Sequence, residues 1–398
     1  MAKHNQRPFK FSSRRIPRAV YALTASIGVI GSNSLVLGPI APEVARSLGA
    51  SVPAVMAASS AFGLGTAASA LFLARYIDRF GARRMLGLSM AALSAALLLC
   101  ALAPLVAALV AAQLIAGIAS GIALPAIYAS AATVAEPGRE GRTIGIVLTG
   151  WTLSMVAGVS LSAVLADTLH WRSVYAVVGM LAAVAVGALS GLMPRGEPLS
   201  SATAPLPLSA LALPGVKPLL VACGMFMAGF YGVYGYLGDH LTNGLGQAVS
   251  ANGLAALLYG IGFGGSVVLD PLIERVGARR LMPMAFVAVA AVFLGFAVLG
   301  DSFAAIVGLM LFWGLANHLG LNLVVMRLTA IDPDRRGTVM GLNSAVTYLA
   351  VFGGTAGFGP LYSAYGFSAC ALVAMGLTLV AVFAGTWPCY SAAMPNRL

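Results

Sequence analysis

Twelve apolar runs follow one another along the 398 residues, and each is long enough to cross a lipid bilayer as a helix. A spanning helix needs about 20 mainly apolar residues. The runs cover residues 19–40, 52–74, 85–103, 105–134, 143–166, 173–193, 218–240, 251–272, 281–300, 302–330, 338–361 and 368–388. The sequence therefore predicts an all-α membrane protein with twelve transmembrane helices.

The composition excludes several soluble classes. Hydrophobic residues make up 60% of the chain and charged residues only 9%, against roughly 25% charged residues in a typical soluble domain. One globular core could not bury that much apolar surface, so a soluble enzyme, a disordered protein and a nucleic-acid binder are excluded. The four cysteines have no CxxC or metal-ligand spacing, so we expect no metal site, no disulfide framework and no cofactor.

The basic residues predict the orientation of the helices. Of the 23 lysines and arginines, 20 fall in the N-terminal tail, in alternate loops or near the C-terminus, and the exceptions are Arg46, Arg172 and Arg327. Loops rich in Lys and Arg stay on the cytoplasmic side of a membrane. We therefore expect both termini in the cytoplasm and a multi-pass protein of a bacterial-type inner (plasma) membrane. The net charge of +11 is thereby explained by the topology, so it no longer supports nucleic acid as a partner.

Two loops repeat at one offset of 196 residues. The segment Ile77–Arg84 reads IDRFGARR, and Ile273–Arg280 reads IERVGARR. The loop residues Glu136, Pro137, Arg139, Gly141 and Gly145 recur as Asp332, Pro333, Arg335, Gly337 and Gly341. The chain is therefore predicted to hold two parallel, pseudo-symmetric six-helix bundles, residues 1–193 and 218–398, joined by a cytoplasmic linker at 194–217.

Parallel six-helix repeats are typical of transporters that bind substrate near the bilayer midplane and rock one half against the other. No HExxH motif, GxSxG motif with partners or pair of carboxylates lies at bilayer depth, so we expect no enzyme. A receptor or scaffold would need larger soluble domains.

The segment after the second run resembles the signature of the major facilitator superfamily, Gly-x-Leu-x-Asp-Arg-x-Gly-Arg-Lys. The matching positions are Ala74, Tyr76, Asp78, Arg79, Gly81 and Arg83. The chain looks most similar to the drug:proton antiporter branch, which implies proton-coupled export. It departs from that branch at Gln113, where many members carry an arginine, and at Gly158-Val159-Ser160, where the antiporter motif has Gly-Pro.

The repeated loops predict a conformational latch. A carboxylate beside several arginines accepts charge-assisted hydrogen bonds, so the loops can hold the cytoplasmic ends of the two halves together. The alternative is that these charges only cap helices and set the topology. The predicted latch residues are Asp78, Arg79, Gly81, Arg83, Glu274, Arg275 and Arg279.

Aromatic and amide residues within the runs predict a substrate cavity, because small-molecule pockets are mainly apolar with a few directional polar groups. The members are Asn33, Gln113, Tyr128, Trp151, Tyr231, Tyr234, Tyr259, Trp313, Asn317, Asn322 and Tyr348. For any one of them the alternative is ordinary helix packing. The absence of fixed charge favours a neutral, zwitterionic or lipophilic cationic substrate.

None of the twelve acidic residues lies in the middle of a run. The candidates for a proton carrier are His318, which titrates near neutral pH, and Asp239. The alternative for His318 is a neutral structural residue. The preferred hypothesis is therefore a monomeric exporter of small organic molecules that exchanges them for protons. A facilitator or symporter for a neutral metabolite such as a sugar or nucleoside is the second hypothesis.

Overall fold

The computed structural model describes residues 16–136, 139–193, 206–332 and 335–386, and these form helices without any strand. The first six-helix bundle is confirmed. It contains α1 (Arg18–Leu48), α2 (Val52–Phe72), α4 (Ala82–Leu102), α5 (Val106–Val134), the continuous helix α6–η1–α7 and α8 (Trp171–Leu192). The continuous helix consists of α6 (Glu140–Leu153), the π-helical turn η1 (Ser154–Val159) and α7 (Ser160–Thr168).

The second bundle repeats this order after the 3₁₀ helix η2 (Pro207–Ala212). It contains α9 (Val216–Asp239) with its π-helical extension η3 (His240–Gly244), α10 (Val249–Gly265) with the 3₁₀ turn η4 (Ser266–Leu269), α12 (Ala278–Leu299), α13 (Phe303–Thr329) and α14 (Arg336–Thr386). Short helices α3 (Tyr76–Phe80) and α11 (Asp270–Val276) occupy the repeated segments that the sequence predicted as loops.

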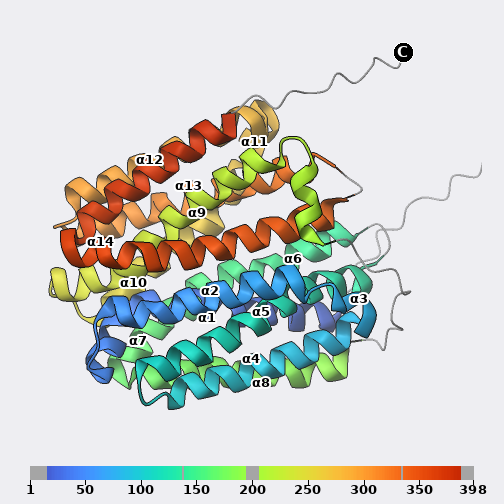
Figure 1. Cartoon of the computed structure of the whole chain (residues 1–398), viewed down its shortest axis with the longest axis horizontal. Coiled ribbons are helices and arrows are strands. Elements are labelled where there is room, and N and C mark those ends of the chain that lie inside the picture. Colours follow the sequence, from blue (N-terminus) through green and yellow to red (C-terminus); the bar gives the residue numbers. More distant parts are fainter. Residues whose placement is uncertain (1–15, 137–138, 194–205, 333–334, 387–398) are drawn as a thin grey trace, which may run out of the picture.

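Helix α14 supplies the last two spans. A straight helix of its 51 residues would be about 77 Å long, more than twice the roughly 30 Å hydrocarbon thickness of a bilayer. The chain folds back at Gly366, whose φ of 76° and ψ of −172° are not helical, and Figure 1 shows the two arms meeting at this corner at the left and both running back toward the right. The described residues hold eleven helices long and apolar enough to span a membrane, and counting the two arms of α14 separately gives twelve spans.

The repeat is visible in local backbone geometry. Gly81 ends α3 and precedes α4 with φ 84° and ψ 135°, and Gly277 joins α11 to α12 with φ 83° and ψ 142°. This left-handed region of φ favours glycine, because other residues carry a Cβ that clashes there. The same corner therefore occurs twice, 196 residues apart.

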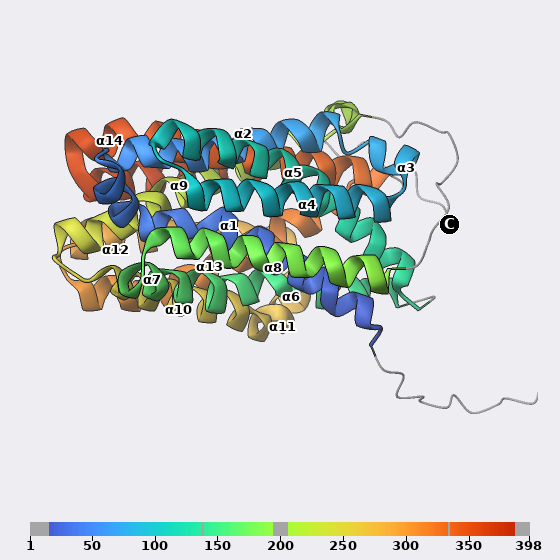
Figure 2. The same cartoon turned by 90° about the horizontal axis from the view of Figure 1, so that it is seen from below.

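The two bundles meet mainly where α1 packs on α9 and α10, α2 on the first arm of α14, and η1–α7 on α10. We call the end of the molecule that carries α3, α11 and η2 the basic end, and the other the opposite end; they lie at the right and left of Figures 1 and 2. The helices of both bundles run between these two ends, so the interface between the bundles runs the length of the protein.

The predicted end of the first helix at residue 40 is wrong. Helix α1 continues through Pro39 and Pro42 to Leu48. Proline removes one backbone hydrogen bond, but transmembrane helices tolerate this where neighbours satisfy the freed groups. The carbonyls freed by these prolines are those of Leu35 and Gly38, four residues before each. Asn252 of α10 donates to the carbonyl of Pro39 itself at 2.7 Å, so the neighbouring bundle contacts α1 at this irregular stretch.

Candidate functional site

Aromatic side chains of the second bundle gather around Phe230 of α9. Its ring centroid lies 5.4 Å from that of Tyr234, 5.6 Å from that of Tyr259 and 5.1 Å from that of Trp313. Tyr231, the next residue on α9, contacts Phe230 edge-on at 4.9 Å. The structure therefore brings four predicted cavity residues together, and adds Phe230, which the sequence analysis missed although it directly precedes Tyr231.

Two buried polar groups of this aromatic cluster have no hydrogen-bond partner among the described residues. Asn317 Nδ2 donates to the Tyr259 hydroxyl at 2.8 Å, but Asn317 Oδ1 and Trp313 Nε1 form no such bond. A buried polar group without a partner costs roughly 1–3 kcal/mol. A donor and an acceptor are therefore available to a molecule that enters here.

A second polar pair lies in the first bundle. Asn33 of α1 and Gln113 of α5 exchange two amide hydrogen bonds, of 3.1 Å from Asn33 Nδ2 and 3.0 Å from Gln113 Nε2. Both side chains are almost fully buried, at 3% and 2% exposure. The pair is neutral and mutually satisfied, so Gln113 adds no fixed charge where the resemblance would place an arginine.

Replacing one member of this pair is expected to destabilise the protein more than replacing both. Asn33→Leu leaves the Gln113 amide buried and unsatisfied, which should lower the stability by about 2 kcal/mol, whereas two apolar residues can be nearly neutral. Thermal unfolding of the two single variants and of Asn33→Leu/Gln113→Leu in detergent measures this. Additive losses in the double variant would contradict the pairing.

Aromatic residues of both bundles complete the set that we call the central cluster. Half-buried Tyr128 of α5 lies beside Trp151 of α6, and Tyr348 of α14 lies near both Tyr128 and Tyr231. The Tyr348 ring also contacts Phe62 of α2 at 6.1 Å. The central cluster comprises Asn33, Gln113, Tyr128, Trp151, Phe230, Tyr231, Tyr234, Tyr259, Trp313, Asn317 and Tyr348. The remaining predicted member, Asn322, is half-buried on α13.

The two predicted proton carriers lie apart. His318 is next to Asn317 on α13, and its ring contacts Phe263 of α10 edge-on at 4.3 Å. Asp239 is at the last position of α9, at the opposite end of the molecule. Of the two, only His318 adjoins the central cluster.

The described latch residues form no bridge between the bundles. Arg83 donates to the Ser190 carbonyl of α8 at 2.6 Å, within its own bundle, and Arg79 lies over the neighbouring Phe80 ring at 5.5 Å. Among the described side chains, Glu274, Arg275 and Arg279 have no ion pair. The side chain of Asp78 lies outside the described residues.

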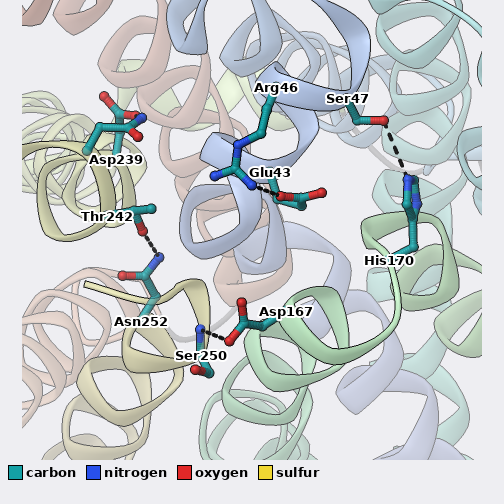
Figure 3. A network of polar contacts seen from close by, with 10 residues as sticks. Glu43, Arg46, Ser47, Asp167, His170, Asp239, Thr242, Ser250 and Asn252 are labelled. Atoms are coloured by element: carbon teal, nitrogen blue, oxygen red, sulfur yellow. Dashed lines mark hydrogen bonds and ion pairs between the residues drawn. The ribbon is translucent and has the colours of Figure 1, made fainter. Parts of the chain in front are cut away.

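Contacts between the bundles concentrate at the opposite end, and Figure 3 shows part of them. Asn252 of α10 donates to the carbonyls of Pro39 in α1 and Gly238 in α9, and to the Thr242 hydroxyl. The Ser250 backbone N–H donates to Asp167 of α7 at 3.3 Å. Deeper in the interface, the hydroxyls of Ser60 and Thr355 are 2.6 Å apart.

Small residues let the helix backbones approach closely at this end. A Cβ at Gly238 would lie 2.9 Å from Pro39 Cα, and a Cβ at Gly253 would lie 2.6 Å from the Ser160 carbonyl oxygen. Glycine at such positions is characteristic of helix interfaces in membranes. Hydrogen bonds and close packing therefore both hold the bundles together at the opposite end.

The π-helical turn η1 occupies the place of the Gly-Pro that the resemblance would imply. Gly158 in this turn packs against Ser32 of α1, and Gly31 of α1 packs against Trp151 and Ser154. A π-helical turn interrupts the α-helical bonding pattern and often occurs at functional sites. The helix is therefore irregular here without a proline.

Known proteins resemble this chain over most of its length. The family model of the Major Facilitator Superfamily matches residues 23–355. The chain is 26% identical over 366 residues to YwfA of Bacillus subtilis (strain 168), an uncharacterized MFS-type transporter, covering 90% of this chain and 89% of that one. It is 25% identical over 339 residues to YceJ of the same strain, also an uncharacterized MFS-type transporter, covering 84% and 86%.

Two solved structures share the fold. A point mutant of the nucleoside transporter NupG superposes with a TM-score of 0.73 at 15% identity, covering 92% of this chain and 98% of that one. The human organic anion transporter MFSD10 superposes with a TM-score of 0.71 at 16% identity, covering 92% and 99%. At these identities the likeness concerns the fold alone.

Proposed function

The chain belongs to the Major Facilitator Superfamily of membrane transporters, and from this premise we propose that it exports small organic molecules across a bacterial-type inner membrane in exchange for protons. Both termini would then lie in the cytoplasm, on the side of the basic end. The two bundles would rock about the central cluster, so that it faces the two sides of the membrane in turn.

The composition of the central cluster supports small organic molecules without a strong negative charge as the substrates. It holds aromatic and amide side chains from both bundles, and the described acidic and basic residues lie toward the helix ends. A dicarboxylate or a phosphate ester would need paired arginines or lysines. The unpaired Trp313 Nε1 and Asn317 Oδ1 suit instead a neutral, zwitterionic or lipophilic cationic molecule with one acceptor and one donor.

The contacts at the opposite end support alternating access. They join the two bundles there, whereas the described side chains of the proposed latch form no hydrogen bond or ion pair across the bundles at the basic end. This arrangement fits a state that is closed toward the outside, in which the latch would be released. In the other state the latch would form while the contacts of Asn252 open.

His318 is our candidate for the proton carrier, because it is the titratable residue that adjoins the cluster from α13. A second candidate function is transport of a neutral metabolite without proton exchange. The neutral pair of Asn33 and Gln113 favours it. Many proton-coupled members carry an arginine at the position that Gln113 of α5 occupies here, and this chain has no charge there.

Transport assays in proteoliposomes separate the two functions. Neutral, zwitterionic and lipophilic cationic compounds are screened with and without an imposed pH gradient. We expect the gradient to accelerate transport of at least one compound several-fold in the wild type, and His318→Gln to abolish that acceleration while substrate exchange continues. His170→Gln, a histidine at the opposite end that contacts Ser47, is the matched control. Equal rates with and without the gradient would favour the second function.

A further inference from the structure

A cavity of about 700 Å³, wide open to the outside of the molecule, lies between the bundles at the opposite end. The first bundle contributes the end of α1 and the segment from Ala50 to Pro53, and the second contributes Asp239, the π-helical turn η3 and the corner of α14. Drug-sized molecules occupy pockets of about 300–1,000 Å³. The cavity is therefore large enough for a small organic molecule, and it is separate from the central cluster.

A buried carboxylate lines this cavity, and no lysine or arginine among the described residues pairs with it. Asp239 is only 7% exposed and accepts hydrogen bonds from Asn243 Nδ2 at 2.6 Å and from the Tyr362 hydroxyl at 2.7 Å. Both donors are neutral. Among the described residues, no lysine or arginine forms an ion pair with it: Arg46 also lines the cavity, but its Nη1 contacts Glu43 at 2.6 Å.

Aromatic rings stand next to the carboxylate. Tyr362 and Phe367 both line the cavity; Tyr362 stacks on Tyr236 at 5.0 Å, and Phe367 stacks on His240 at 4.4 Å. These contacts fix the rings in place. A carboxylate combined with aromatic faces is the combination that recognises organic ammonium groups, through charge and cation–π attraction.

We propose that this cavity binds an organic ammonium compound, with the cationic group beside Asp239 and its apolar part between α1, α2 and the corner of α14. Because both bundles line the cavity, the bound cation stabilises the closed arrangement of the opposite end. The site is a second one, distinct from the central cluster, and it does not depend on which molecule the protein transports.

Binding of benzyltrimethylammonium to the purified full-length protein tests the proposal by isothermal titration calorimetry. We expect saturable binding by the wild type and at least a roughly 30-fold weaker affinity in Asp239→Asn, because the charge pair is lost. Asp301→Asn is the matched control: it removes the same charge at the same end of the molecule but outside the cavity lining. We expect it to bind like the wild type.

Two further variants test the location. Ser363→Trp places a large side chain in the cavity lining at an exposed position, and we expect it to weaken binding even if Asp239→Asn does not fold. Asn317→Ala alters the central cluster and is expected to leave the Asp239-dependent part of the binding unchanged, whether or not the central cluster also takes the compound. The proposal would be overturned by no binding in the wild type, by equal affinity in Ser363→Trp, by equal losses in the Asp301 and Asp239 variants, or by loss of the Asp239-dependent part in Asn317→Ala.

Discussion

Gly314→Val is expected to prevent the protein from accumulating in a folded form. Gly314 of α13 packs directly on the backbone of α10: a Cβ there would meet the carbonyl oxygen of Tyr259 and lie 2.8 Å from the amide nitrogen of Phe263. A backbone atom cannot rotate away as a flexible side chain can, so the two helices would have to separate. This would also break the bond from Asn317 to Tyr259.

We expect a loss of about 3 kcal/mol, at the upper end of the range for overpacked cores. Size-exclusion chromatography and thermal unfolding in detergent measure it. Gly308→Val provides a control on the same helix, because a Cβ at Gly308 meets nothing within 4 Å. If both variants behaved alike, valine in α13 itself would be the cause and the close packing of α10 on α13 would be refuted.

Asn252→Ala is expected to open the opposite end of the interface. Its amide nitrogen donates to the carbonyl of Gly238 in its own bundle and, across the interface, to that of Pro39, so its removal deletes a bond that joins the two bundles only in the closed arrangement. A loss of about 2 kcal/mol is reasonable for buried groups left unpaired. That corresponds to a roughly 30-fold shift in the ratio of closed to open molecules.

Spin labels on either side of the interface measure this shift as a distance distribution. Leu169 in the first bundle and Leu299 in the second are 70% and 49% exposed at this end, and both can be replaced by cysteine in a background with the four native cysteines changed to alanine. We expect Asn252→Ala to populate a longer distance. Ser250→Ala should not, because Ser250 contacts Asp167 through its backbone N–H. An unchanged distribution in Asn252→Ala would show that packing alone closes this end.

The sequence was sufficient to predict the spans and the repeat, because length, apolarity and loop charge are properties of single segments. It was not sufficient for features that depend on neighbouring helices. Helix α1 continues through two prolines, and α10 contacts it there through the bond from Asn252 to the Pro39 carbonyl, which no pattern in α1 alone indicates. The segments of α3 and α11 form short helices although they are too polar to resemble spans.

The same distinction applies to the candidate site. Composition placed Asn33 and Gln113 in one cavity, but their pairing depends on how α1 is rotated against α5, and they are 80 residues apart in sequence. Asn252 was missed for a similar reason: one amide in a small-residue helix has no distinguishing pattern until Pro39 and Gly238 are seen beside it. The latch and the proton carrier stay predictions.

The corner at Gly366 joins the last two spans through a single non-helical residue. The first arm contacts α2 across the interface, through Ser60 and Thr355, while the second arm packs on α12, where Phe367 contacts Phe296. A connection of one residue is too short to extend, so a displacement of either arm along its neighbour must displace the other arm as well. A movement of the first arm at the interface between the bundles is therefore transmitted through the corner to the second arm and to α12.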